Sequence, residues 1–214
     1  MRGDEINRDE YIRASIAYLF RIKLDDKYLL IRNVKSSGWG MYKPVGGCYK
    51  FFDSAKPALN NLGVIEEVSD NKDFRVYVPK KNWEKFICWY NLGQDREVDF
   101  SREFNEELFE ENNFLSPENF DEVDFKKIKD GSFEVNFSKS YKIDASFPMD
   151  VVDVNLTPEQ ASDLRDMVEN SDGMFALADE QSIINEEIEV DGREIKIAYH
   201  AQELLDAPVE TQGI

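Results

Sequence analysis

The sequence is poor in the residue types that build two common kinds of site. Only two cysteines and one histidine occur among its 214 residues, which excludes a disulfide framework and a zinc centre made of cysteine and histidine ligands. Cys48 and Cys88 are therefore expected to be buried as small apolar residues.

Positive charge is also scarce. The chain has 26 basic against 44 acidic residues, which gives a net charge of −18. Duplex nucleic acid is excluded as a partner because phosphate binding needs clustered lysine and arginine. An anionic ligand would need a local basic patch or a metal ion.

Long apolar runs are missing as well. None approaches the roughly 18 to 20 residues of a membrane span, and the N-terminal MRGDEINRDE has no apolar core of a signal peptide. We therefore expect no membrane segment in this chain and a cytoplasmic protein. The 42% hydrophobic and 13% aromatic residues can nevertheless fill a large core.

Hydrophobic periodicity predicts strands at both ends of the chain around central helices, which favours one α+β domain. The expected elements are a hairpin over 11–33, a Gly- and Pro-rich strand–loop–strand over 36–52, helices over 54–65, 80–91 and 98–114, a strand over 73–79, two or three strands over 131–156, a helix over 157–170, a short helix over 176–186, and a strand or loop entering a final helix over 193–206.

The helix expected over 98–114 carries two groups of residues at helical spacing, the acidic group Glu103, Glu106 and Glu107 and the apolar group Phe100, Phe104 and Leu108. The acidic group occupies one face, where like charges repel unless hard divalent cations sit among the oxygens. The apolar group can anchor the helix on a sheet. The alternative is that the glutamates form an ordinary solvated face of a very acidic protein.

The order of these elements, with a Gly-Gly loop after Pro44, resembles the Nudix superfamily. The stretch Arg102-Glu103-Phe104-Asn105-Glu106-Glu107 matches the second half of that family's sequence box. Its first half departs: Cys88 stands at the family's Gly position and Gln94 at its Glu position. Phe109 and Glu110 replace the closing Gly and apolar residue. The predicted helix therefore continues through Glu111, with Asn112 or Asn113 as its cap.

Further motifs make the chain similar to the SMODS-associated Nudix domain, a branch found beside cyclic-oligonucleotide synthases in bacterial anti-phage (CBASS-type) defence. They are Pro44-Val45-Gly46-Gly47 before Tyr49-Lys50, the strand from Phe74 to Pro79, the helix with Trp83, Phe86 and Trp89, and Arg96-Glu97 before Arg102-Glu103. The resemblance implies a Nudix fold, with a mixed β-sheet between α-helices. It also implies an N-terminal extension over 1–11, the domain over 12–205 with an insertion over 48–100, and a flexible tail over 206–214.

The resemblance also implies roles for individual residues. Arg102, Glu103 and Glu106 would be catalytic; Glu103, Glu106 and Glu107 would bind Mg²⁺ or Mn²⁺; and Lys43, Gly46, Gly47, Tyr49 and Lys50 would bind the nucleotide. The glutamates would hold a metal that bridges a diphosphate, while Arg102 orients one of them. His200 could carry a proton, although a lone histidine at a helix start is more often structural.

Three functions remain open at this point. The first is a sensor that binds a nucleotide or cyclic oligonucleotide and signals to a partner or through a homo-oligomer. The second is a Mg²⁺-dependent hydrolase of a phosphoanhydride bond. The third is a scaffold with an inactive cleft, which the intact glutamates disfavour. Related effectors carry transmembrane helices, whereas this chain is expected to have none.

Overall fold

The computed structural model describes residues 6–33, 40–67, 73–110, 119–120 and 122–206. The chain divides into two compact units. Unit 1 comprises Met1–Tyr18, Gly47–Phe100 and Asp130–Asp150, and unit 2 comprises Leu19–Gly46, Ser101–Lys129 and Val151–Ile214. The division falls within strands β2 (Ala17–Arg21), β6 (Gly46–Cys48) and β12 (Met149–Asn155). Each unit is thus assembled from segments far apart in the sequence.

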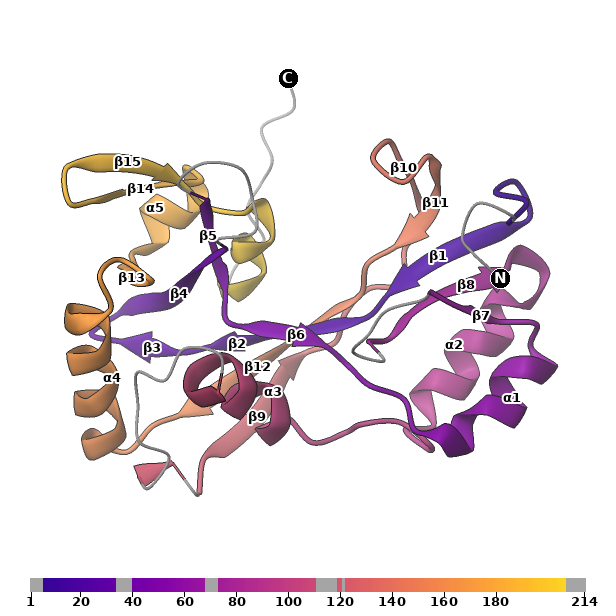
Figure 1. Ribbon diagram of the computed structural model, residues 1–214, viewed down its shortest axis with the longest axis horizontal. Helices are drawn as coiled ribbons and strands as arrows, with labels where there is room; N and C mark the ends of the chain where they lie inside the picture. The colour runs from indigo at the N-terminus through magenta and orange to yellow at the C-terminus, as the bar shows by residue number, and fades with distance from the viewer. Residues whose placement is uncertain (1–5, 34–39, 68–72, 111–118, 121, 207–214) are drawn as a thin grey trace. The chain divides into compact units, whose positions relative to one another are not determined.

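Unit 1 is built on a five-stranded sheet of order β10-β11-β1-β8-β7, with β1 parallel to β11 and antiparallel to β8. Its elements are β1 (Tyr11–Ser15), η2 (Asp53–Ala55), α1 (Lys56–Asn61), β7 (Ile65–Glu66), β8 (Arg75–Pro79), η3 (Lys80–Asn82), α2 (Trp83–Asn91), β10 (Asn136–Ser138) and β11 (Ile143–Ser146). The stretch 48–100, expected to be an insertion, supplies β7, β8, α1 and α2, so it forms part of the unit 1 sheet and its helical cover (Figure 1).

The α2 helix is held by aromatic packing. Its residues Trp83, Phe86 and Tyr90 are buried, as the spacing of three and four predicts. Phe74, which is fully buried, contacts Phe86 and Tyr90 with ring centroids 6.1 and 5.6 Å apart. These contacts fasten α2 to the segment that leads into β8, and they confirm the helix expected over 80–91.

Unit 2 contains a second sheet of order β13-β4-β3, in which β5 also pairs with β4. Its elements are β3 (Lys23–Leu24), β4 (Lys27–Asn33), β5 (Met41–Pro44), α3 (Ser101–Asn105), η4 (Glu106–Glu110), β9 (Asp124–Lys129), α4 (Pro158–Asn170), β13 (Phe175–Ala178), α5 (Glu180–Ile184), β14 (Glu187–Val190), β15 (Arg193–Lys196) and η6 (Tyr199–Leu204). The turn between β3 and β4 has Asp25 and Asp26 at φ 50° and 62°, the geometry of a tight hairpin. This turn joins the antiparallel strands β3 and β4 within the hairpin expected over 11–33.

A third sheet has the order β6-β2-β12-β9. Strand β9 lies at its end and pairs with β12 in a register that shifts between Val151 and Val152. Most residues of β9 are exposed. Its polar sequence lacks the alternation of apolar and polar residues that would predict a strand.

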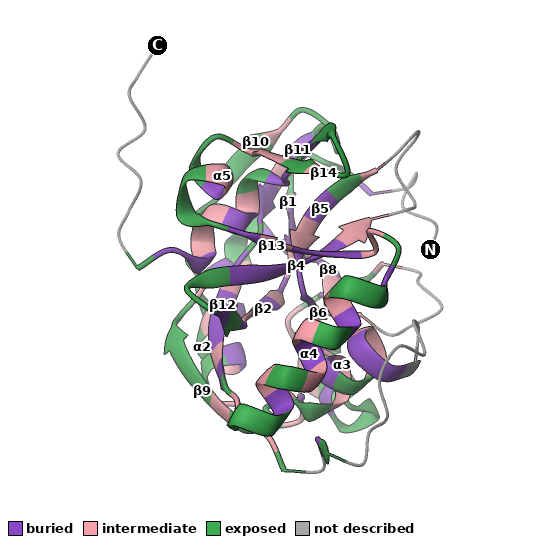
Figure 2. Cartoon of the chain, turned by 90° about the vertical axis from the view of Figure 1, so that its left-hand side faces the viewer, coloured by how far each residue is buried: buried purple, intermediate pink, exposed green. Residues whose placement is uncertain are grey.

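Helix α4 begins as the sequence predicts. The Thr157 side chain accepts a hydrogen bond from the Gln160 backbone N–H, and the Gln160 side chain accepts one from the Thr157 backbone, which forms a capping box. Leu164 and Met167 lie on its buried stripe, and Figure 2 shows buried and exposed residues alternating along the helix.

Several local expectations are corrected. Cys88 is exposed and Cys48 is half-buried, so neither is a fully buried core residue. The final helix expected after Lys196 is present as a 3-10 helix, η6. Hairpin β14–β15 was not predicted. The α+β class is confirmed by the mixture of helices and sheets, and within the described residues no helix could cross a membrane.

Candidate functional site

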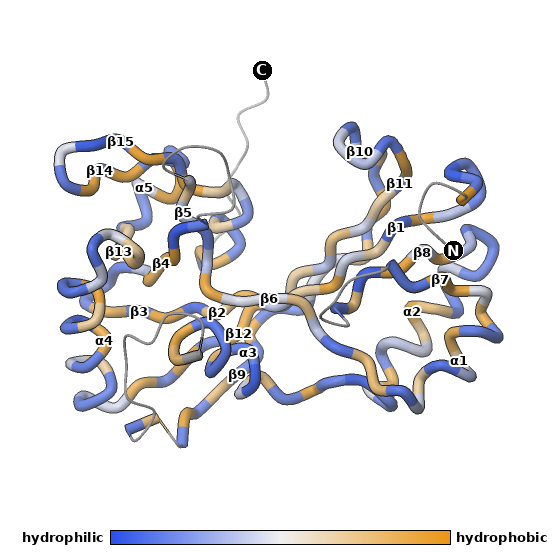
Figure 3. The backbone as a smooth tube through the Cα atoms, in the orientation of Figure 1, coloured by the Kyte–Doolittle hydropathy of each residue, from blue (hydrophilic) through white to orange (hydrophobic). Residues whose placement is uncertain are grey.

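Helix α3 is fixed by the aromatic side chain of Phe104. This residue is 1% exposed and makes edge contacts with Phe20 of β2 and Phe125 of β9, at centroid distances of 5.4 and 5.3 Å. Leu108 is fully buried one turn later. In Figure 3, α3 is coloured largely as hydrophilic, since Phe104 is the one apolar residue of Ser101–Asn105. Phe100, expected in the same apolar stripe, instead belongs to unit 1 and contacts Tyr18.

The helix changes its winding inside the acidic motif. Residues up to Asn105 are α-helical, whereas Glu106–Glu110 form a π-helical turn. Such turns occur frequently at functional sites. The expected continuation through Glu111 to a cap at Asn112 or Asn113 lies outside the described residues.

The structure brings the three glutamates together with two cationic side chains, all within unit 2. The Arg102 Nη1 atom donates to the Oε2 atoms of both Glu103 and Glu106, each at 2.6 Å. The Lys43 Nζ atom on β5 donates to Glu107 Oε1 at 3.1 Å. Arg102 thus holds two carboxylates of the cluster.

Burial sets the electrostatics of this group. It raises the pKa of the Glu103 carboxyl to about 7, because loss of water outweighs the attraction of Arg102 and the neighbouring Glu107 and Glu106 add repulsion. The Glu103 side chain is 13% exposed and that of Glu106 33%. The cluster therefore combines a sheltered carboxyl that is half protonated near neutrality with a more accessible one.

The chemistry of these side chains suits a hard divalent cation. Carboxylate oxygens are the ligands that Mg²⁺ prefers, and Glu103, Glu106 and Glu107 would supply them. In the present side-chain positions the positive charge comes from Arg102 and Lys43, and no group of three acidic, histidine or cysteine side chains in the described part of the chain is arranged to hold a metal ion.

The glycines expected in a loop instead begin strand β6, and they fall on either side of the division between the units. Gly46 has φ 144°, a conformation that side chains rarely allow. The preceding Val45 carbonyl accepts a hydrogen bond from the Phe20 N–H at 2.9 Å. The backbone at Gly46 thus depends on the absence of a side chain, as the sequence suggested for Gly46 and Gly47.

Tyr49 and Lys50 belong to unit 1. The Tyr49 ring is 2% exposed, and its hydroxyl donates to Asp150 Oδ2 at 2.5 Å. Burial, with Asp150 nearby, raises the pKa of this hydroxyl. Base stacking on Tyr49 would require its segment to open. The Lys50 backbone N–H donates to Glu97 Oε2 at 3.1 Å, and the Lys50 carbonyl accepts from the Glu97 N–H at 2.9 Å.

Arg96 and Glu97 act as structural supports in unit 1. The Arg96 guanidinium lies 3.9 Å from the Tyr90 ring centroid, and its Nε donates to the Tyr90 carbonyl at 2.9 Å. Glu97 is 7% exposed and holds the Lys50 backbone. The Arg96-Glu97 pair that precedes Arg102 in the sequence thus stabilises a packed turn of unit 1.

His200 lies near the candidate site, which sequence position alone could not establish. The start of η6 is tied to β5 by a hydrogen bond from the Ala198 N–H to the Tyr42 carbonyl, at 2.7 Å. Burial and the positive charge of Lys43 lower the pKa of His200. His200 therefore lies within electrostatic range of the same lysine that binds Glu107.

Comparison with known proteins identifies the family. The family model described as the SMODS-associated NUDIX domain matches residues 11–205. No curated protein and no solved structure matches the chain. The match spans both units and includes the glutamate cluster with Arg102 and Lys43, so the chain belongs to the SMODS-associated NUDIX domain family.

Proposed function

We propose that this domain recognises a nucleotide signal through the glutamate cluster of unit 2, in a CBASS-type antiviral system of bacteria. The observation that carries the proposal is the gathering of Glu103, Glu106 and Glu107 around Arg102 and Lys43. When bound there, Mg²⁺ or Mn²⁺ would neutralise phosphate oxygens. The ligand class is a cyclic oligonucleotide or a related nucleotide, which supplies the phosphates.

The chain's own residues would perform distinct parts of this recognition. Lys43, which lies beside Glu107, would donate to a phosphate oxygen of the ligand. Glu106 is the more exposed of the two carboxylates and Glu103 the more buried. As metal ligands, Glu106 would exchange readily with water, whereas Glu103 would shield the metal from it. Arg102 keeps both carboxylates in place on a helix anchored by Phe104.

Recognition is favoured over turnover by the departures from the family box. Gln94 stands where hydrolases of the superfamily carry a glutamate, and Phe109 and Glu110 replace the closing residues. Binding needs only neutralised phosphates, whereas hydrolysis also needs a water held in line with the scissile bond. The surviving glutamates nevertheless favour a second candidate, a Mg²⁺-dependent hydrolase of a nucleoside diphosphate linked to another group or of a signalling nucleotide.

The test is calorimetric titration of the purified chain with cyclic di- and trinucleotides in Mg²⁺, followed by chromatography of each mixture. Glu106→Gln removes a cluster carboxylate, and Glu169→Gln removes an exposed one on α4 as a matched control. Recognition predicts binding that weakens at least tenfold in Glu106→Gln only, with the ligand recovered intact.

Other results distinguish the alternatives. New products that disappear in Glu106→Gln would establish the hydrolase. Equal binding by both variants, or binding unaffected by EDTA, would refute a metal-dependent site at the cluster. Size-exclusion chromatography with and without ligand would show whether recognition is coupled to a homo-oligomer.

A further inference from the structure

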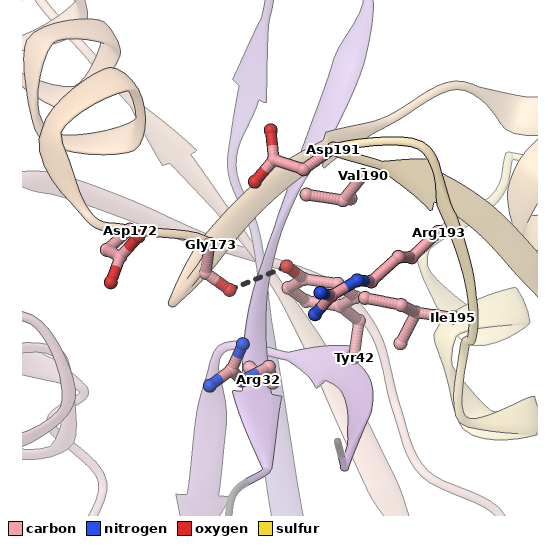
Figure 4. Close-up of a pocket in the computed structure, with 8 residues that line it drawn as sticks. All are labelled: Arg32, Tyr42, Asp172, Gly173, Val190, Asp191, Arg193 and Ile195. Carbon is pink, nitrogen blue, oxygen red and sulfur yellow. Dashed lines mark hydrogen bonds between the residues drawn. The ribbon is translucent and has the colours of Figure 1, made fainter.

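Unit 2 contains a second concave site, at the tip of hairpin β14–β15. The cavity has a volume of about 260 Å³. Its walls come from four segments: the end of β4, strand β5, the turn between α4 and β13, and the hairpin (Figure 4). Arg32 and Arg193 contribute guanidinium groups, and Asp172 and Asp191 contribute carboxylates.

The walls of this cavity are held by specific contacts. Tyr42 is fully buried, and its hydroxyl donates to the Gly173 carbonyl at 2.6 Å. Gly173 has φ 71°, and a Cβ built on it would lie 3.7 Å from that hydroxyl and 3.8 Å from Arg32 Nη1. The Arg32 backbone N–H donates to the Met174 carbonyl at 2.8 Å. The turn, β4 and β5 thus form a preorganised base for the cavity.

The hairpin supplies the opposite wall with equally defined geometry. Asp191 and Gly192 have φ 52° and 72°, and Val190 pairs with Arg193 across them, as in a two-residue type I′ turn. Among the residues that the structure describes, β14 and β15 form a two-stranded sheet, and such a hairpin is marginally stable by itself. Its conformation must therefore be supported by contacts at its ends and at the cavity.

This cavity is distinct from the glutamate cluster. Successive side chains of a strand point to opposite faces of a sheet. On β5, Tyr42 faces the cavity, while the next residue, Lys43, donates to Glu107. A ligand in the cavity would therefore contact the other face of the strand that carries the cluster's lysine.

The charges that line the cavity indicate which class of ligand it can bind. Two guanidinium groups and two carboxylates balance, so the lining gives no net attraction for a polyanion. It offers hydrogen-bond donors from arginine and acceptors from aspartate, beside the apolar Val190 and Ile195. A neutral planar molecule with acceptors on one edge and donors on another fits this lining.

We propose that the cavity is a binding site for a guanine base. Guanine presents O6 and N7 acceptors, which arginine binds with two parallel hydrogen bonds, and N–H donors on another edge, which a carboxylate accepts. Adenine carries an amino group where guanine has O6. A hydrogen-bond donor of adenine would therefore face the donors of the guanidinium. The volume is below the roughly 300 to 1,000 Å³ of pockets for drug-sized ligands, which suits one base.

The proposal goes beyond the function of the glutamate cluster and is tested separately from it. The full chain is titrated calorimetrically with guanosine, adenosine and inorganic phosphate in EDTA, so that neither a metal nor a nucleotide phosphate contributes. Guanosine is expected to bind once per chain, adenosine at least tenfold more weakly, and phosphate without displacing guanosine.

Matched variants locate the binding. Asp191→Asn and Arg193→Ala are both exposed substitutions on the hairpin and should each weaken guanosine binding at least tenfold. Glu194→Gln, next to Arg193 but outside the cavity lining, and Glu106→Gln should leave it unchanged. Thermal melting identifies any variant that does not fold, in which case the other hairpin variant decides.

Four results would overturn the proposal. They are absence of guanosine binding, equal affinity for adenosine, displacement by phosphate, and affinity unchanged in both hairpin variants. Loss of guanosine binding in Glu106→Gln would assign the base to the glutamate cluster instead. Failure of the cluster to bind a nucleotide with Mg²⁺ would leave this result unaffected, because the assay contains no metal.

Discussion

Replacement of Glu103 by glutamine should stabilise the domain, and the gain should grow with pH. The folded chain raises the pKa of this carboxyl from 4.5 to about 7, chiefly through burial. The folded state therefore binds a proton that the unfolded state releases near its ordinary pKa. Stability contributed by the neutral acid is fully present below about pH 4.5 and is lost as pH rises through about 7.

The size of the effect follows from the shift. A displacement from 4.5 to about 7 corresponds to an upper limit of about 3 kcal/mol. Because part of the carboxyl is open to water, screening reduces the expected gain in Glu103→Gln to about 1 to 2 kcal/mol at pH 8. The glutamine amide oxygen can still accept a hydrogen bond from Arg102, so the helix is not deprived of that contact.

Urea unfolding followed by tryptophan fluorescence, at pH values from 5 to 8 in EDTA, measures the free energy of unfolding. Glu169→Gln, an exposed change on α4, serves as the control and should show no such trend. An advantage of Glu103→Gln that stays constant with pH would show that burial does not control this carboxyl. A loss of stability at pH 8 would show that attraction to Arg102 outweighs burial.

Three further substitutions test the packing around both units by the same unfolding assay. Thr157→Ala should lower the free energy of unfolding by about 1 kcal/mol through loss of the α4 cap, and Thr157→Ser should restore it; an unchanged alanine variant would contradict the capping box. Tyr49→Phe should cost about 1 to 3 kcal/mol because Asp150 loses a buried donor, and a neutral outcome would indicate that water replaces the hydroxyl. Phe104→Ala should cost about 3 to 5 kcal/mol by emptying the aromatic contacts under α3. It should also weaken Mn²⁺ binding by the cluster, and a stable variant would show that α3 is not anchored there.

The sequence predicted best where short-range chemistry decides the structure. Thr157 and Gln160 specify a helix start by themselves, and Asp25-Asp26 between apolar runs specifies a hairpin. The grouping of Glu103 and Glu106 about Arg102 also follows from helical spacing. Such features need only residues within about one turn of each other.

Long-range features were not accessible in the same way. The pairing of Lys43 with Glu107 depends on strand β5 lying beside the π-helical turn η4, which spacing along the chain cannot reveal. Burial of Tyr49 and Glu97 depends on the unit 1 core. The β14–β15 hairpin contains Asp191-Gly192, a recognisable turn signal, but its charged strands obscured the alternation. The π-helical turn at Glu106 has no simple sequence signature.

The exposed strand β9 has a consequence for solubility at high concentration. Within the described chain, one edge of β9 pairs with β12 and the other pairs with no strand. An unpaired strand edge can pair with the same edge of another copy of a protein through backbone hydrogen bonds. Lys126, Lys127 and Lys129 place like charges along this strand, and the register shift in β12 distorts it locally. We expect the lysines and the register shift to oppose pairing of this edge with another copy of the chain.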